Sequence, residues 1–110
     1  MKLSITTKDF ELTPAIKSHV ERALEPLHKH FHPLPTPVHV TLSIDKFHKI
    51  AEAHIHLPGH KDIEASYSSK DMYASIDLLA KNLDEQALKH KEKMKKHSHG
   101  GDGHHNAEQS

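Results

Sequence analysis

The chain of 110 residues lacks cysteine altogether, and it also lacks any long hydrophobic run. Without thiols it can form neither a disulfide nor a thiolate metal site. No stretch approaches the roughly 20 apolar residues that a membrane-spanning helix needs, and residues 1–6 do not have the character of a signal peptide. We therefore expect a single domain with a modest core, located in the cytoplasm and without membrane contact.

Glycine is scarce as well, and its distribution argues against an enzyme. Three of the four glycines lie beyond residue 98, so the chain has no glycine-rich loop for phosphate binding. A nucleophile elbow is absent, and the acidic residues are scattered along the sequence rather than paired. A small two-layer domain leaves little room for a substrate cleft. The sequence predicts no enzymatic activity, no cofactor and no small-molecule substrate.

The formal net charge is zero, but the positive charge is concentrated in one segment. Residues 1–88 contain ten basic and twelve acidic residues, a net charge of −2, whereas residues 89–96 contain five lysines and one glutamate. A cationic cluster of this kind indicates a polyanionic partner such as nucleic acid. The alternative is a solvated helix end whose dipole favours cations, but one or two lysines would suffice for that.

Hydrophobic alternation predicts four short strands, at residues 3–6, 38–45, 51–57 and 63–68. The last three follow one another through short connections, which is typical of an antiparallel meander with one solvated face. The outward positions of these strands carry no Phe, Tyr or Trp. This face is therefore not a base-stacking platform like that of RNA-recognition motifs. It could contact an RNA backbone or a 2′-OH, but a plain solvated surface is at least as good an interpretation.

A first amphipathic helix is predicted over residues 13–31. Thr13 can cap it, and Pro14 suits the first helical position because the missing N–H would have no partner there. Pro26 lies inside the apolar periodicity, where it removes one backbone hydrogen bond. We expect the helix to continue through Pro26 with a kink or weakened last turns.

A second helix is predicted from Ser68 to about His97, with Ser68 and Asp71 at capping-box spacing. Its apolar face comprises Met72, Ile76, Leu79, Leu83, Ala87, His90 and Met94. The predicted fold is α+β, a two-layer structure with a four-stranded sheet and two helices packed on one face, in the order β-α-β-β-β-α. Residues 1–97 form this domain, and residues 98–110 form a His- and Gly-rich tail that we expect to be disordered.

Fourteen histidines are unusual for a chain of this length. They add positive charge on mild acidification, because histidine titrates near neutral pH. Pairs that could bind zinc or nickel occur at His28/His32, His54/His56 and His104/His105, yet none has a clearly placed third ligand. No metal site is predicted, although a His-rich metal-binding protein remains an alternative.

Several segments together resemble one protein family. The helix start Asp71-Met72-Tyr73 is followed by Ala74-Ser75-Ile76-Asp77, and the helix ends with Lys89-His90-Lys91. The N-terminal residues 3–6 and 11–16 fit the same family. From Met1 to about His97 the chain resembles the short ribosome hibernation-promoting factors, which form one family with bacterial protein Y, the ribosome-associated inhibitor A.

The resemblance implies a function and a set of RNA-binding residues. Such factors bind the small ribosomal subunit and its rRNA in the mRNA and tRNA channel, inhibit translation in stationary phase or stress, and preserve idle ribosomes. The matching positions, including more loosely matched ones, are Arg22, Lys29, Lys81, Lys89, His90, Lys91, Lys93, Lys95 and Lys96. The helix start at Asp71, Met72 and Tyr73 is interpreted as mainly architectural.

The chain also departs from the family. Basic residues are usual in the family where this chain has Ala23, Pro26, Asn82 and Glu85. The tail has no aromatic residue and only two acids, Asp102 and Glu108, unlike the acidic-aromatic tail of the inhibitor type, which favours the hibernation-promoting type. That type assists ribosome dimers together with a separate ribosome modulation factor, and we expect a monomer away from the ribosome. A general module for structured RNA remains the alternative.

Overall fold

The structure is a computed structural model that describes residues 2–31, 36–57 and 59–98, with only the backbone described for Phe31 and residues 91–98. Its elements are, in chain order, β1 (Lys2–Lys8), α1 (Pro14–Ala23), α2 (Glu25–Phe31), β2 (Pro37–Asp45), β3 (His48–Ile55), β4 (Ile63–Ser69) and α3 (Met72–Ser98). The predicted tail falls almost entirely on residues 99–110, which lie outside the described part.

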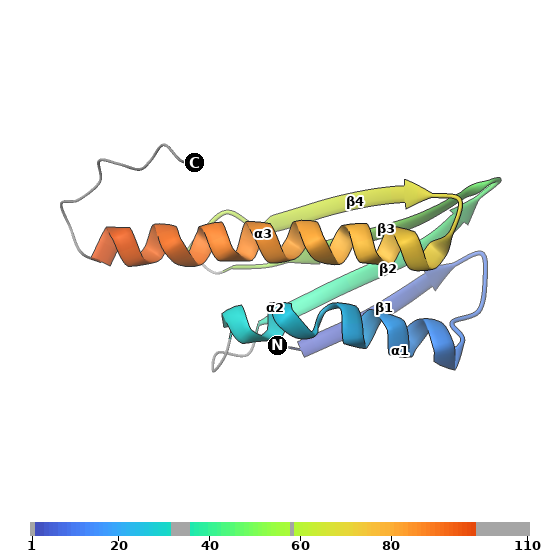
Figure 1. The fold of residues 1–110 in the computed structure, drawn as a ribbon, viewed down its shortest axis with the longest axis horizontal. Coiled ribbons are helices and arrows are strands. Elements are labelled where there is room, and N and C mark those ends of the chain that lie inside the picture. Colours follow the sequence, from blue (N-terminus) through green and yellow to red (C-terminus); the bar gives the residue numbers. More distant parts are fainter. Residues whose placement is uncertain (1, 32–35, 58, 99–110) are drawn as a thin grey trace.

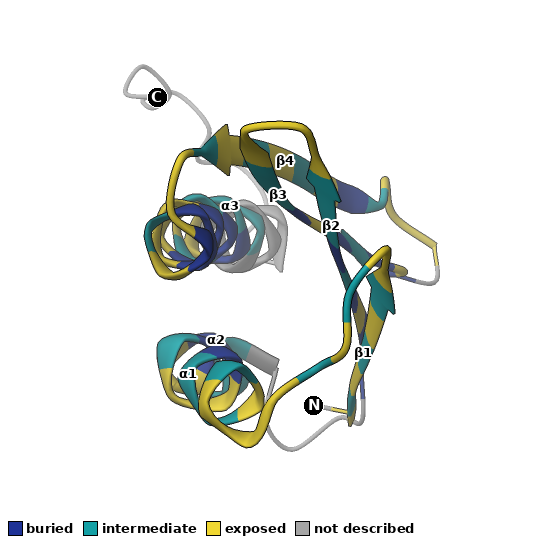
Figure 2. Ribbon diagram, turned by 90° about the vertical axis from the view of Figure 1, so that its right-hand side faces the viewer, coloured by how far each residue is buried: buried dark blue, intermediate teal, exposed yellow. Residues whose placement is uncertain are grey.

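The four strands form one sheet in the order β1-β2-β3-β4. β1 pairs with β2 in parallel, and the other two pairs are antiparallel. Figure 2 shows the helices side by side on one face of this sheet, with the other face uncovered. The predicted two-layer α+β fold is confirmed.

The first helix is divided into two, which corrects the prediction of one continuous, kinked helix. α1 begins as expected, since the Thr13 hydroxyl accepts the Ile16 N–H at 3.2 Å. It ends at Ala23 with Leu24 as its C-cap, and α2 starts at Glu25. Pro26 has no N–H to donate to the Arg22 carbonyl, so the helical hydrogen bonding cannot continue there. Pro26 then lies in the first turn of α2, where proline is tolerated.

The start of α3 also differs from the predicted capping box. Ser68 still belongs to β4 and pairs with Ile50, so its backbone is committed to the sheet. Asp71 is the residue that caps the helix, because its Oδ1 accepts the Tyr73 N–H at 3.3 Å. The Ser69 hydroxyl supports this turn by donating to the Asp71 carbonyl at 2.7 Å.

The core lies between the sheet and the helical layer. The predicted apolar face of α3 is buried as far as Ala87, with Ile76 and Leu83 no more than 1% exposed. Ser75 is buried among these residues, and its hydroxyl donates to the Lys49 carbonyl at 2.6 Å. This contact fixes the start of α3 against the beginning of β3. Among the described helices, none is long and apolar enough to span a membrane.

Candidate nucleic-acid interface

α3 is both the longest element and the element that carries the cationic segment. It has 27 residues and is therefore about 40 Å long. Figure 1 shows its C-terminal turns extending past the end of the sheet and past α2. The last buried side chain described on it is Ala87, and the next two residues, Leu88 and Lys89, are exposed. The lysine segment, residues 89–96, thus lies on a part of α3 that projects beyond the core and is called the arm below.

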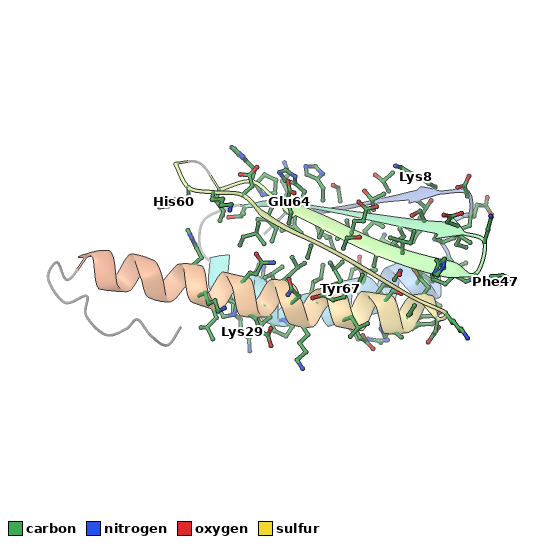
Figure 3. The ribbon with its side chains drawn as sticks, turned by 90° about the horizontal axis from the view of Figure 1, so that it is seen from above. Lys8, Lys29, Phe47, His60, Glu64 and Tyr67 are labelled. Carbon is green, nitrogen blue, oxygen red and sulfur yellow. The ribbon has the colours of Figure 1, made fainter. Side chains whose placement is uncertain are left out.

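Four of the predicted RNA-binding residues have described, exposed basic side chains: Arg22 on α1, Lys29 on α2, and Lys81 and Lys89 on α3. Within the described part of the chain, every ion pair uses a histidine as the cation, so none of these four side chains is neutralised by an acid. Figure 3 shows Lys29 on the helical side, away from the sheet. These side chains are available to an anionic ligand.

The remaining predicted lysines, Lys91, Lys93, Lys95 and Lys96, belong to α3 by their backbone, but their side chains lie outside the described residues. His90 is half-buried, and its ring meets the ring of His60 edge-to-face with centroids 4.9 Å apart. This contact connects the β3–β4 loop to the base of the projecting arm. His90 follows Lys89 in the sequence, and its contact with His60 also holds the base of the arm in place.

Two histidine–aspartate contacts connect the helices, and sequence reasoning missed both. The Nε2 of His19 lies 2.8 Å from Oδ1 of Asp77, and the Nε2 of His30 lies 2.8 Å from Oδ1 of Asp84. The partners are 58 and 54 residues apart, so no local spacing could have indicated them. They fix α1 and α2 relative to α3 and thereby set where the basic residues of the three helices lie.

The helix signature Asp71-Met72-Tyr73 has structural roles. Asp71 caps α3, and Met72 is 6% exposed within the core. The Tyr73 ring packs edge-to-face on the His19 ring with centroids 4.9 Å apart. These placements agree with the architectural interpretation of the segment.

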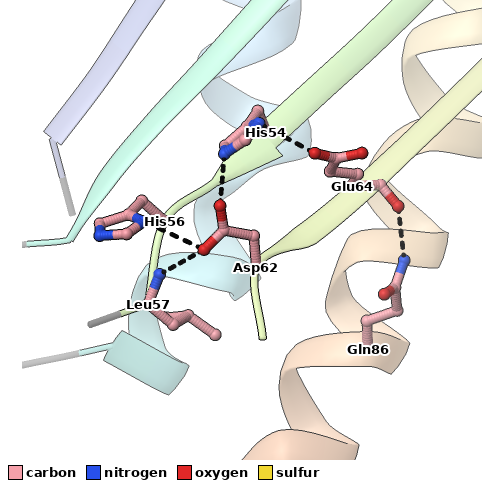
Figure 4. Close-up of polar contacts among 6 residues, drawn as sticks. All are labelled: His54, His56, Leu57, Asp62, Glu64 and Gln86. Atoms are coloured by element: carbon pink, nitrogen blue, oxygen red, sulfur yellow. Dashed lines mark hydrogen bonds and ion pairs between the residues drawn. The ribbon is translucent and has the colours of Figure 1, made fainter. Parts of the chain in front are cut away.

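The open face of the sheet has a different chemistry from the helical side. Figure 4 shows Asp62 between two histidines, 2.9 Å from His54 Nε2 and 3.0 Å from His56 Nδ1. Glu64 lies 3.2 Å from the other ring nitrogen of His54. Partial desolvation acts to raise the pKa of Asp62, but the Leu57 N–H and the two histidines outweigh it and hold that pKa below its usual value of 3.8.

A shallow hollow of about 500 Å³ lies on this open face, lined by His39, Thr41, Glu52, Ala53, His54, Glu64, Ala65 and Ser66. Its two glutamates repel phosphate, and it has no Phe, Tyr or Trp side chain on which a base could stack. Within the described residues, no group of three or more His, Cys, Asp or Glu side chains is arranged to hold a metal ion. The helical side is therefore the better candidate for an RNA interface.

Comparison with known proteins identifies the family of the chain. A family model described as "Sigma 54 modulation protein / S30EA ribosomal protein" matches residues 3–95. A ribosome hibernation promoting factor of Klebsiella oxytoca is 38% identical over 97 residues, covering 88% of this chain and 100% of the relative. The factor of Azotobacter vinelandii is 37% identical over 94 residues, covering 86% of each chain.

Solved structures give the same answer for the fold. A ribosomal subunit interface protein from Coxiella burnetii matches with a TM-score of 0.70 and 30% identity, over 84% of this chain and 99% of the other. The N-terminal domain of Thermus thermophilus protein Y matches with a TM-score of 0.72 and 26% identity, over 82% and 99%. The resemblance found in the sequence is confirmed.

Proposed function

Because this chain belongs to the Sigma 54 modulation protein / S30EA ribosomal protein family, we propose that it is a ribosome hibernation factor that binds the small ribosomal subunit. In this proposal it occupies the channel for mRNA and tRNA, so that bound protein inhibits translation. The family consists of ribosome hibernation factors, which are not enzymes, and this confirms the prediction of no enzymatic activity.

The observation that carries the proposal is the concentration of positive charge at the C-terminal end of α3, where residues 89–96 contain five lysines and one glutamate. The described lysine and arginine side chains on the helices have no acidic partner, whereas Glu52, Asp62 and Glu64 gather on the open face of the sheet. Phosphate is attracted to the lysine segment of α3, whereas the acidic side chains around the hollow on the open face repel it. RNA should therefore bind across the helices and along the projecting arm of α3.

The arm is suited to a confined RNA site. Its lysines occur on a helix whose base is docked on the core, so their backbone positions are fixed before binding. Each phosphate that a lysine neutralises releases condensed counterions, so the affinity should fall steeply with salt. The predicted contacts Lys91, Lys93, Lys95 and Lys96 extend the basic surface beyond Lys89.

In the cell, the proposed role is to preserve idle ribosomes during stationary phase or stress. The hibernation-promoting type acts with a separate ribosome modulation factor in forming ribosome dimers, and we propose the same partner here. The protein itself is proposed to be cytoplasmic and monomeric away from the ribosome.

Sedimentation of stationary-phase lysates tests the cellular role. The protein should co-migrate with small subunits or whole ribosomes, and deletion of its gene should reduce the dimer fraction. Migration only at the top of the gradient would contradict the proposal. If the fraction of ribosome dimers persists after deletion, only the proposed role in ribosome dimerisation is contradicted.

Competition tests the binding site. Purified small subunits loaded with an mRNA and initiator tRNA should bind the protein more weakly than empty subunits, because the proposed sites overlap. Equal binding to both would place the protein outside the channel. Equally tight binding to an unrelated structured RNA would favour a general RNA-binding module instead.

A further inference from the structure

The tip of the β2–β3 hairpin carries an aromatic side chain that the fold does not use. Phe47 is 79% exposed, the highest value among the exposed large hydrophobic residues described in this chain. Asp45 and His48 pair across the hairpin, so only Lys46 and Phe47 form the turn. Figure 3 shows Phe47 at the end of the molecule opposite to the C-terminal end of α3.

The residues beside Phe47 are basic. The segment Lys46–Lys49 contains two lysines and one histidine without an acid, although Asp45 precedes it. Lys46 and His48 are exposed, and Lys49 is half-exposed. An exposed aromatic ring between cations is a combination found in proteins that bind single-stranded nucleic acid, where the ring stacks on a base and the cations meet the phosphates.

The turn itself holds an unfavourable backbone conformation. Lys46 has φ +59°, in the left-handed region that glycine or asparagine adopts more readily. A two-residue hairpin normally uses those residues at such a position. A lysine here adds no contact to the core, so its charge at the tip is better explained by a ligand than by folding.

The tip is fixed relative to the arm. The Ser75 hydroxyl of α3 donates to the Lys49 carbonyl at the start of β3, at 2.6 Å. Lys89 lies 14 residues further along the same helix, which corresponds to roughly 21 Å along its axis. RNA contacts at these two opposite ends of one folded domain would define the orientation of the protein, which contacts on the arm alone would not.

We propose that the hairpin tip Lys46–Lys49 is a second RNA contact, in which Phe47 stacks on an unpaired base of the small-subunit rRNA. The inference rests on the proposed function, since it names a further contact to the same partner. The cations favour RNA over a protein partner at this tip. Phe47 supplies the stacking surface that the open face of the sheet lacks.

Substitutions at Phe47 test the stacking. Affinity for purified small subunits, measured by sedimentation at fixed salt, should fall roughly 5- to 100-fold for Phe47→Ala. Phe47→Tyr and Phe47→Trp should retain most of the affinity, whereas Phe47→Leu, which keeps the apolar bulk without the ring, should behave like the alanine variant. All four should melt like the parent, because the side chain is exposed. Equal binding of the parent and Phe47→Ala overturns the inference, and so does full binding by Phe47→Leu.

Substitution of Lys46 provides an independent test. Lys46→Gly relieves the left-handed backbone, so the melting temperature should not fall, yet the affinity should decrease and the salt slope should flatten by about one unit. Lys2→Gln, at an exposed position of β1 on the open face, is the matched control. It should leave the affinity and the salt slope unchanged. An unchanged slope for Lys46→Gly contradicts the phosphate contact.

Photo-crosslinking identifies the partner at the tip. p-Benzoylphenylalanine in place of Phe47 should crosslink to rRNA on purified small subunits, and a crosslink to a ribosomal protein would overturn the inference. If the unsubstituted chain does not bind small subunits, the proposed function fails and this inference with it. If it binds and Phe47→Ala binds equally well, only this inference fails.

Discussion

His30 on α2 and Asp84 on α3 approach to 2.8 Å between Nε2 and Oδ1, and this contact joins the two halves of the helical layer. His30 is the more buried partner, with 15% of its side chain exposed against 41% for Asp84. Its Nδ1 is buried and has no described hydrogen-bond partner. The contact with Asp84 is therefore the polar interaction on which the His30 ring depends.

Loss of the Asp84 carboxylate should destabilise the fold. Asp84→Ala leaves a buried ring nitrogen without its partner, which should cost about 1–3 kcal/mol in the free energy of unfolding measured in urea. Asp77→Ala is the matched control, because it breaks the corresponding contact to His19 at a site where the carboxylate is 62% exposed. Asp77→Ala should lower the free energy of unfolding by less than about 1 kcal/mol. A larger loss for Asp77→Ala than for Asp84→Ala would contradict this ranking.

Periodicity predicted most of the fold because each strand and helix buries one face. It did not predict where elements end, since those limits depend on pairing partners. β3 begins at His48, three residues before the alternation indicated, because His48 to Ile50 pair with β2 and β4. The turn before it, Lys46-Phe47, has none of the usual hairpin residues, and so the hairpin tip was not recognised.

The candidate site was predictable in part. Lysines gathered in one segment are visible in composition, and the resemblance pointed to further basic residues on the helices. The His19–Asp77 and His30–Asp84 contacts that arrange those helices join residues far apart in sequence. They follow from tertiary packing, which a single sequence does not reveal.

Replacement of the arm lysines should reduce binding without affecting folding. A variant with Gln at Lys89, Lys91, Lys93, Lys95 and Lys96 should bind small subunits more weakly, and the slope of log affinity against log salt should flatten by roughly one unit per lost phosphate contact. Lys2→Gln/Lys8→Gln on β1 is the control for a general loss of charge. Binding like that of the parent at moderate salt would show that the arm does not contact RNA.

The docking of α3 depends on its buried face. Ile76 is 1% exposed, so Ile76→Ala should lower the free energy of unfolding by about 2–5 kcal/mol. Leu78, two residues along the same helix, is 44% exposed, and Leu78→Ala should cost much less. Urea denaturation of both variants measures the difference. Similar losses for the two would mean that α3 is rotated relative to its described position.

Asp62 should make stability sensitive to acid. Its pKa is lowered in the folded state, so the carboxylate stabilises the fold above the unfolded pKa, and this contribution disappears as pH falls through the folded pKa. Parent stability should therefore decline more steeply than that of Asp62→Asn between about pH 5 and pH 3. Asp45→Asn, at the other end of the sheet, should follow the parent. If the free energy of unfolding falls in parallel with pH for the parent and for Asp62→Asn, the fold does not stabilise the Asp62 carboxylate.

Mild acid should tighten binding to small subunits. The chain has 14 histidines, and exposed ones gain positive charge as pH falls from about 8 to 6. Histidines occur in the helices that carry the basic residues, for example His28 in α2 and His97 in the lysine segment of α3, so these helices are where an effect of histidine on RNA binding is expected. Affinity measured at fixed ionic strength should rise towards pH 6, and the salt slope should steepen as more cations meet phosphates. His28→Gln/His97→Gln should reduce this pH dependence. His48→Gln, in the hairpin tip, measures how much of the pH dependence comes from that tip. A flat profile, or weaker binding at pH 6, would show that these histidines do not approach RNA.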